Sequence, residues 1–468
     1  MKVLKYLTAL LFAAMILVPV LLFNREEPAM SAIDNRYLAE NPFRSAETVD
    51  ELNRGLEAYV SDRIGLRDEM ILGYTVLNDR LFHKMVHPTY SYGKEGCVFG
   101  SGLTVEERYN GFHEAFADMV AAIHQYCAER DVPFLFVFNP AKPAVYQEYV
   151  PDGIDYNREW VDRLMLALEE RGVPVLDNTE VLTEKRLAGE AVFNWKYDAN
   201  HWNDLGAYYG VNAILERMQQ EIPTTHVNAP EEVHRGTHLE TSLLVSDFPI
   251  HEEVPEFSLD TELIDSTDAY ARELELHPDY RNIGMVENPE MLAAGSPRAL
   301  VFQGSYMNHY GLKFMEHALG GYDHIHDYQN VIRFPYYFNL FRPDYVVFEV
   351  AEYTFADGYF DYEQMLAIDY NRPCAQVLAG TAQQRQELLP EQSLTAEPGE
   401  VLTKLLWTTE EQADYGWLLL DGAEYDLEAV EGGYQVTIPT EQTGLLPELE
   451  LVTVSGNTAC RYRLPETE

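Results

Sequence analysis

The chain has 468 residues, enough for two or three domains, and its 46% hydrophobic and 24% charged residues are the balance of a globular protein. That balance excludes disorder, a collagen helix or a coiled coil as the main state. Acidic residues number 77 against 33 basic ones, and the net charge of -44 repels phosphate backbones, so we expect no nucleic-acid partner.

Residues 1–25 predict a signal anchor that crosses the membrane as a helix. Lys2 and Lys5 precede an uncharged apolar stretch, residues 6–23, at the lower limit of length for the ~30 Å hydrocarbon core. The basic flank favours a cytoplasmic N-terminus and an extracytoplasmic body. No small-x-small cleavage site follows, so we expect a single-pass anchor in the cell membrane; a cleaved signal peptide is the alternative.

Strand and helix patterns alternate over residues 26–370. After a polar stalk, residues 49–82 have a helical pattern and residues 90–99 read as a glycine hairpin. Short apolar runs then predict buried strands at 133–138, 173–176, 299–302 and 345–350. Helices are expected at 106–130, 156–171 and 205–220, and from the third strand to Leu319. The expected fold is α/β, a largely parallel sheet flanked by helices on both faces.

Two stretches depart from this alternation. Residues 221–290 are polar and irregular, which indicates an insertion such as a lid or a substrate-facing loop. Residues 371–468 contain short apolar segments between turn residues, which predicts a small β-rich C-terminal domain. The four cysteines contain no C-x-x-C pair, so neither a disulfide framework nor a zinc site is indicated; a single bridge stays open.

Asp198 and His201 form the first candidate site. The spacing lets the carboxylate accept a hydrogen bond from the imidazole, which fixes the tautomer that a general base needs. A D-x-x-H pair also occurs by chance. The structural alternative is that Asp198 caps the following helix and His201 is merely packed.

Ser305 forms the second candidate site, directly after the expected strand 299–302. A serine at a strand-to-helix turn lies at the carboxyl end of the sheet, where a nucleophile and an oxyanion pocket can share one turn. Gly304 lets the backbone approach a ligand closely. The alternative is that Ser305 only caps a helix.

Together the two motifs resemble the alginate O-acetyltransferase AlgX/AlgJ type and the related DHHW family, which have an SGNH-hydrolase-like domain. In those families a D-x-H-W block precedes a G-[TD]-S-[YF] block, as His201-Trp202 precedes Ser305-Tyr306 here. The resemblance covers roughly residues 34–356, and further similar stretches are 34–38, 59–68, 92–99, 139–151 and 342–352.

The chain departs from the family pattern at two places. Ala199 stands where the family has its aspartate, whereas Asp198 matches the D-x-x-H block of SGNH hydrolases in general. The serine turn has Gln303 before Gly304, in place of Gly-Thr-Ser or Gly-Asp-Ser.

The resemblance implies acyl transfer without a cofactor or a metal. Ser305 would attack the acyl donor, His201 would carry the proton, and Asp198 would orient His201. Gly304, Tyr306, Trp202 and Lys142 are the oxyanion-side or substrate-side candidates. A polysaccharide hydroxyl as acceptor gives O-acetylation, water gives esterase activity, and a membrane-bound O-acyltransferase is the expected partner.

Three alternatives stay open. A lysine after a strand is more often a solvated loop charge than a site residue, and we favour that interpretation for Lys142. The segment Asp323-His-Ile-His-Asp327 has histidines on one face of a strand, but a polar strand end is a better interpretation than a metal site. The whole chain could also be a non-catalytic glycan-binding or scaffold protein with a degenerate site.

Overall fold

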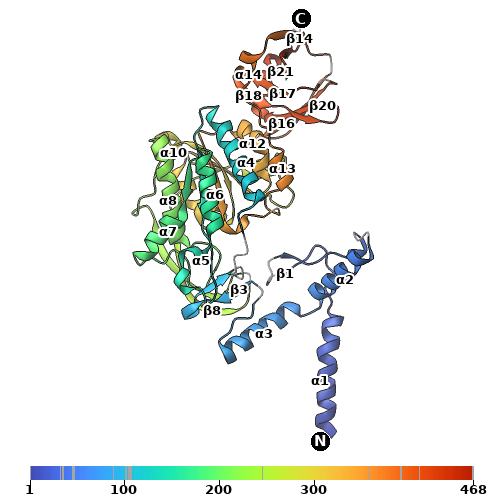
Figure 1. Ribbon diagram of the computed structural model, residues 1–468, viewed down its shortest axis with the longest axis vertical. Helices are drawn as coiled ribbons and strands as arrows, with labels where there is room; N and C mark the ends of the chain where they lie inside the picture. The colour runs from blue at the N-terminus through green and yellow to red at the C-terminus, as the bar shows by residue number, and fades with distance from the viewer. Residues whose placement is uncertain are drawn as a thin grey trace.

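Three parts follow one another along the long axis of the computed structural model (Figure 1). An N-terminal arm lies at one end, a sheet-and-helix body in the middle and a strand-rich part at the other end. The structure describes residues 2–31, 33, 36–44, 48–87, 89–100, 103, 108–244, 246–356, 358–390, 393–410 and 412–465. Residues 34–35 of the family-like segment and 106–107 of an expected helix lie outside this range.

The arm consists mainly of helices. Helix α1 (Lys2–Leu21) is followed by the short strands β1 (Met30–Ser31) and β2 (Arg36–Tyr37), α2 (Val49–Arg63) and α3 (Arg67–Phe82). One helix in this structure, Val3–Leu21, is long and apolar enough to cross a membrane, which a signal sequence also satisfies.

The helical pattern at 49–82 forms two helices, α2 and α3. The break lies at residues 64–66, where Leu66 has a left-handed backbone (φ 61°). A Cβ on Gly65 would lie 2.4 Å from Leu22 Cβ, so α1 packs directly on this turn. Contact with a distant segment overrides the helical pattern here.

The body is built on a seven-stranded sheet of order β6-β5-β13-β11-β12-β10-β9. Its first five strands run parallel, while β10 and β9 are antiparallel to their neighbours. The bounds are β5 (Phe134–Asn139), β6 (Val175–Asp177), β9 (Ile264–Asp265), β10 (Ile283–Glu287), β11 (Arg298–Gln303), β12 (Gly321–His326) and β13 (Tyr345–Ala351). All four strands predicted from apolar runs lie among the parallel five.

Alternate residues of the central strands enter two different cores. In β5, Phe134, Phe136 and Phe138 belong to one buried cluster, and Leu135 and Val137 belong to the other. Helices therefore cover both faces, as a parallel sheet requires. The first core includes residues of α4 (Gly111–Ala128), α6 (Glu159–Glu170) and α12 (Phe334–Phe341). The second includes residues of α7 (Asn178–Leu187), α8 (Asp204–Glu221) and α11 (Leu312–Ala318).

The stretch expected to be an irregular insertion, 221–290, is more ordered than predicted. It forms the hairpin β7 (His234–Ser242) and β8 (Pro249–Ser258), the helix α9 (Thr267–Glu273), and the strands β9 and β10 of the central sheet. Because the strands of the hairpin are mostly exposed and polar, the sequence shows no apolar run that would predict them. The other hairpin, β3 (Tyr90–Tyr92) with β4 (Val98–Gly100), lies where the glycines predict it.

The C-terminal part contains two sheets of order β14-β22-β21-β17-β18 and β15-β16-β20-β19. The short helices not yet named, from the body as well as the C-terminal part, are α5 (Lys142–Val145), α10 (Pro289–Ala294), α13 (Tyr362–Leu366) and α14 (Cys374–Gly380). The strands are β14 (Gln383–Leu388), β15 (Leu394–Pro398), β16 (Leu402–Thr408), β17 (Tyr415–Leu420), β18 (Ala423–Asp426), β19 (Glu428–Val430), β20 (Gly433–Pro439), β21 (Glu450–Ser455) and β22 (Thr458–Arg463). Tyr126 of α4 donates to Asp426 Oδ2 at 3.1 Å across the junction with the body.

All four cysteines are buried free thiols. Each one belongs to a different hydrophobic cluster: Cys127 and Cys97 to the two cores of the body, Cys460 and Cys374 to two clusters of the C-terminal part. The single bridge left open by the sequence is therefore not formed.

Candidate active site

Ser305 lies at the carboxyl end of β11, a central strand of the sheet. It begins a helix that passes through a π-helical turn at Met307–Gly311 before it continues as α11. The turn before Ser305 is held by the neighbouring strand, because Gly304 N–H donates to Glu349 Oε2 of β13 at 2.8 Å. Ser305 is half-buried, so its hydroxyl is held in place and still accessible.

Asp198 and His201 lie in the loop between α7 and α8. Asp198 has a left-handed backbone (φ 45°), a conformation that aspartate tolerates better than most residues. Its Oδ1 lies 2.7 Å from His201 Nδ1, and His201 Nε2 lies 2.9 Å from Ser305 Oγ. The structure thus brings the three predicted residues into one hydrogen-bonded chain. The alternative role for Asp198 as helix cap is not seen, since Asn203 caps α8.

The surroundings of Asp198 determine where the protons lie in this series of hydrogen-bonded side chains. Burial raises the pKa of Asp198, but its charge interaction and hydrogen bond with His201, and a hydrogen bond from Tyr310, outweigh burial and lower the pKa overall. Tyr310 donates to Asp198 Oδ2 at 3.0 Å. An ionised Asp198 accepts the Nδ1 proton of His201, which leaves Nε2 free to accept the proton of Ser305.

Tyr353 is a site residue that the sequence analysis missed. It lies two residues after the end of β13, and its hydroxyl lies 2.9 Å from Ser305 Oγ. Tyr353 is 40% exposed, but desolvation around its hydroxyl raises its pKa above the ordinary value, so the hydroxyl keeps its proton and can donate toward the serine. Its position shortly after a buried strand was the available signal, because such positions meet at one edge of a parallel sheet.

Trp202, Tyr306 and Gly304, three of the predicted oxyanion-side or substrate-side candidates, are buried behind Ser305. Trp202 and Tyr306 are fully buried, and Trp202 Nε1–H donates to Tyr306 O at 3.0 Å. The Tyr306 hydroxyl donates to Pro140 O and Asn200 O at 2.6 and 2.7 Å. The amide of Gly304 is already bonded to Glu349, so it is not a free oxyanion donor.

Lys142 is also buried, and the expectation of a solvated loop charge is wrong. Its side chain is 0% exposed and its Nζ donates to Val98 O, Asn194 O and Trp195 O at 2.6, 2.6 and 3.0 Å. Burial lowers the pKa of Lys142, against the opposing effect of neighbouring Cys97. The lysine ties the glycine hairpin to the segment that leads into Asp198.

The two residues that depart from the family pattern have structural explanations. Ala199 is buried in an apolar cluster that includes Tyr90 and Phe248. Gln303 is fully buried; its amide donates to Asn308 Oδ1 at 2.7 Å, and its carbonyl accepts from the Tyr322 hydroxyl. The Gln303 side chain therefore points away from the accessible side of the turn.

Buried carboxyl groups lie directly under the serine turn. Glu349 is fully buried; burial and the nearby charge of Asp327 raise its pKa to about 8. Asn139 Nδ2 donates to its second oxygen at 2.7 Å. Asp327 is also fully buried, burial raises its pKa, and its Oδ1 would lie in ordinary contact, 3.5 Å, from a Cβ placed on Gly304.

Among the described residues, one group of three could hold a metal ion, His226, Glu232 and His317. Its members are already bonded: His226 Nε2 lies 3.0 Å from Glu232 Oε2, which also accepts from Ala229 N–H at 2.6 Å. The segment 323–327 forms no such group in the described structure. His324 is buried in the sheet, and burial lowers its pKa to about 3.

The body is a mixed sheet with helices on both faces, and Ser305, at the carboxyl end of a central strand, lies next to His201 and Asp198. Residues 93–278 match the family model for the SGNH hydrolase-like domain of the acetyltransferase AlgX. The resemblance predicted from the motifs is thereby confirmed over these residues, which are similar to an SGNH-type acetyltransferase domain. The matched range includes Asp198 and His201 and ends before Ser305.

Three solved structures align with more than half of the chain at low sequence identity. The O-acetyltransferase domain of Pseudomonas putida AlgJ is 13% identical, with 60% of this chain and 98% of that one covered and a TM-score of 0.42. Bacillus cereus PatB1 is 14% identical over 57% and 97%, with a TM-score of 0.44. A DHHW family protein from Eubacterium siraeum is 14% identical over 59% and 94%, with a TM-score of 0.42. No curated protein sequence matches the chain.

Proposed function

We propose that the protein is a membrane-anchored, extracytoplasmic serine O-acetyltransferase that acts on a polysaccharide through Ser305, His201 and Asp198. The observation that carries the proposal is the unbroken chain Asp198–His201–Ser305, with 2.7 and 2.9 Å between the bonded atoms. The match to an acetyltransferase family model supports the type of reaction.

In the first half-reaction, Ser305 Oγ attacks the carbonyl carbon of the acyl donor while its proton moves to His201 Nε2. The carbonyl oxygen becomes an oxyanion beside the turn. The Ser305 N–H is suited to hold it, because the first amides of a helix have no intrahelical acceptor. The Tyr353 hydroxyl is a second donor within reach of Ser305 Oγ. His201 then gives its proton to the leaving group, and an acyl-serine remains.

In the second half-reaction, His201 Nε2 takes the proton of an acceptor hydroxyl, whose oxygen attacks the acyl-serine. The new ester bond forms, the bond to Ser305 Oγ breaks, and the proton returns to the serine. The charge of Asp198 stabilises the imidazolium in both steps. A sugar hydroxyl as acceptor gives O-acetylation, and water in its place gives an esterase.

Anchoring by α1 would keep this site at the outer face of the membrane. The helix is long and apolar enough to span, and its side chains are mostly exposed in the structure. A membrane-bound O-acyltransferase that delivers the acyl group from inside is the partner that such a position suits.

The alternative is a glycan-binding protein without catalysis. The displaced aspartate and Gln303 are the sequence features that favour it. Against it, Asp198 reaches His201 from its own position, and the buried Gln303 amide is bonded to Asn308. The enzyme is therefore the function that the geometry supports best.

The test uses the full chain in detergent with p-nitrophenyl acetate and a serine-directed phosphonate. We expect turnover and one label at Ser305, both lost in Ser305→Ala and His201→Ala. Ser455→Ala, an exposed serine in the C-terminal part, is the matched control and should behave as the wild type. Absence of label and turnover in the folded wild type would overturn the proposal and favour glycan binding.

A further inference from the structure

Helix α3 packs on the body with one face only. Thr75 is fully buried, and its Oγ1 donates to Val86 O at 2.5 Å. Leu72 and Val76 pack against a buried apolar cluster, and Asp79 accepts a hydrogen bond from Tyr92 at 3.1 Å. These positions recur at helical spacing, so the side of α3 that faces the body is defined.

The opposite face of α3 carries an exposed apolar stripe. Met70, Tyr74, Leu77 and Leu81 are spaced by four, three and four residues, which places them on one side of a helix. They are 46%, 57%, 55% and 62% exposed, and Phe82 at the end of the helix is 69% exposed. Contiguous exposed apolar surface of this kind marks an interaction site.

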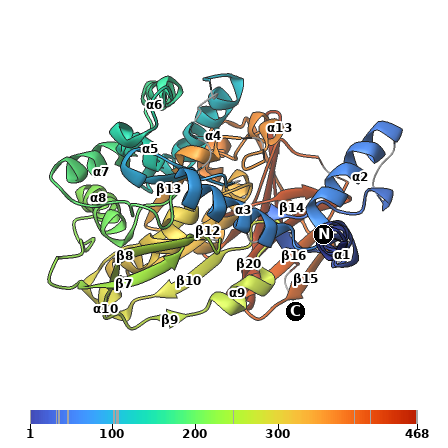
Figure 2. The same cartoon turned by 90° about the horizontal axis from the view of Figure 1, so that it is seen from below.

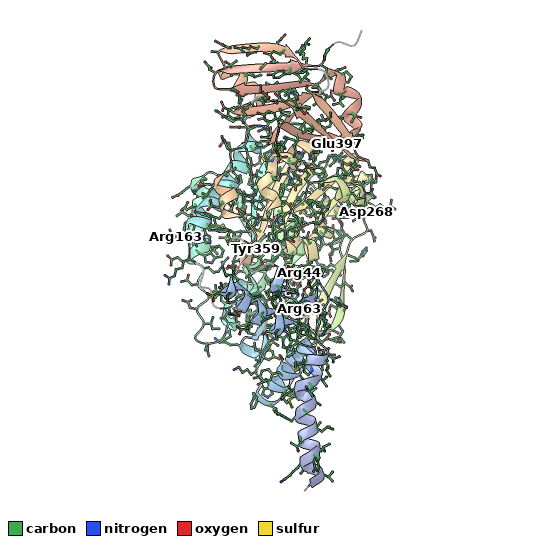
Figure 3. All side chains as sticks on the ribbon, turned by 90° about the vertical axis from the view of Figure 1, so that its right-hand side faces the viewer. Arg44, Arg63, Arg163, Asp268, Tyr359 and Glu397 are labelled. Carbon is green, nitrogen blue, oxygen red and sulfur yellow. The ribbon has the colours of Figure 1, made fainter. Side chains whose placement is uncertain are left out.

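The stripe begins where the membrane-length helix ends. Gly65 N–H donates to Pro19 O of α1 at 2.9 Å, and Asn24 N–H donates to Arg63 O at 2.8 Å. Arg63, labelled in Figure 3 just above α1, is 1% exposed and donates to Ala39 O and Glu26 O. The elbow between α2 and α3 is thus fixed to the end of α1.

The direction of α3 follows from this elbow. In Figure 1, α1 projects away from the body, while α3 starts at the level where α1 ends and runs to the side. Its far end slopes toward the side on which α1 extends. Figure 2 shows α1 nearly end-on and α3 across the view, so the two axes are strongly inclined to each other.

We propose that the stripe of α3 lies in the lipid interface of the membrane that α1 spans, on the side of the body. This inference rests on the proposed anchor. A lipid surface fits because the stripe continues the apolar surface of α1 and contains a tyrosine, a residue suited to the headgroup level. With a net charge of -44, the chain should favour zwitterionic lipid over anionic lipid.

The consequence is that two elements, not one, hold the body at the membrane. A single spanning helix leaves the body free to rotate and tilt. A second helix lying in the interface fixes the orientation of the body. It therefore also fixes the direction, relative to the membrane plane, from which a substrate reaches Ser305.

The experiment places a probe on the stripe of the full chain in phosphatidylcholine nanodiscs. The four native cysteines are buried, so an introduced exposed cysteine can be labelled selectively with an environment-sensitive fluorophore. Leu77→Cys reports on the stripe. Leu388→Cys is the matched control, a leucine 67% exposed on β14, at the end of the molecule farthest from α1 (Figure 1).

Nitroxide-labelled lipid should quench the probe at position 77 about twofold or more and leave the probe at position 388 unchanged, since interfacial helices bury their apolar face in the headgroup region. Equal, weak quenching at both positions in discs that contain the protein would overturn this inference alone. A probe at 77 that is shielded from water but not quenched would mean a protein covers the stripe, which also overturns it. Failure of the chain to enter discs would overturn the anchor and this inference with it.

Discussion

Replacing Lys142 with methionine removes one buried ammonium group and keeps most of the side-chain volume. The three carbonyls that accept from Nζ belong to two separate segments, the hairpin end at Val98 and the chain at Asn194 and Trp195. Trp195 O keeps the N–H of Val98 as a donor. The other two lose a charged donor inside the protein.

The expected loss follows from these contacts. A buried acceptor that loses its partner costs about 1–3 kcal/mol, so two acceptors cost about 2–6 kcal/mol. Removal of the charge also ends its desolvation penalty, which offsets part of this cost. We therefore expect Lys142→Met to lower the free energy of unfolding by about 2–4 kcal/mol. The turnover per folded molecule should fall as well, because the freed segment leads into Asp198 and His201.

The assay is urea unfolding of the full chain in detergent, followed by tryptophan fluorescence, with ester hydrolysis measured at the same time. Lys94→Met is the matched control: Lys94 is 42% exposed and pairs with the exposed Asp152, so its loss should cost less than about 0.5 kcal/mol. Equal stability of the two variants would refute the argument that Lys142 holds the two segments together.

Three further predictions concern the site. Asp198→Asn should lower ester turnover about 10³–10⁴-fold by favouring the wrong tautomer of His201, whereas an undiminished rate would remove Asp198 from the mechanism. Tyr353→Phe should keep the fold and lower kcat about tenfold, the value of one hydrogen bond of about 1.4 kcal/mol to the reacting oxygen; an unchanged kcat would contradict this role. Because the pKa of Glu349 is raised from 4.5 to about 8 in the fold, its contribution to stability is full below about pH 4.5 and is lost as pH rises through about 8. Unfolding free energies at several pH values should show that decline in the wild type and less of it in Glu349→Gln.

The order of strands and helices in the body follows from the sequence where burial is two-sided. The run Phe134–Phe138 is apolar at every position because its alternate residues enter two different cores, so it predicts a central strand. The strand β12 has no such run. Its polar residues Asp323, His324 and His326 predict only a strand end, and its pairing with β11 and β10 places it inside the sheet.

Part of the candidate site was predictable, because some of its residues follow recognisable sequence patterns. Ser305 follows a recognisable strand, and the spacing of Asp198 and His201 permits their bond. Lys142 was misjudged because its burial depends on a hairpin and a loop that are distant in the sequence, and local composition does not report such contacts. Tyr353 was missed because nothing in its neighbours indicates which strand ends next to the serine.

The separate positions of the four thiols have a consequence for the life of the protein outside the cytoplasm, where we propose that the body lies. An oxidising compartment can join cysteines, but each thiol here is enclosed by a different core, so the folded chain offers no pair to oxidise. No disulfide then contributes to stability, and reducing agents should neither help nor harm the native state. Once a molecule unfolds, however, all four sulfurs become reactive together, and wrong bridges would prevent its return. Refolding yields should therefore depend on a reductant, whereas the melting temperature should not.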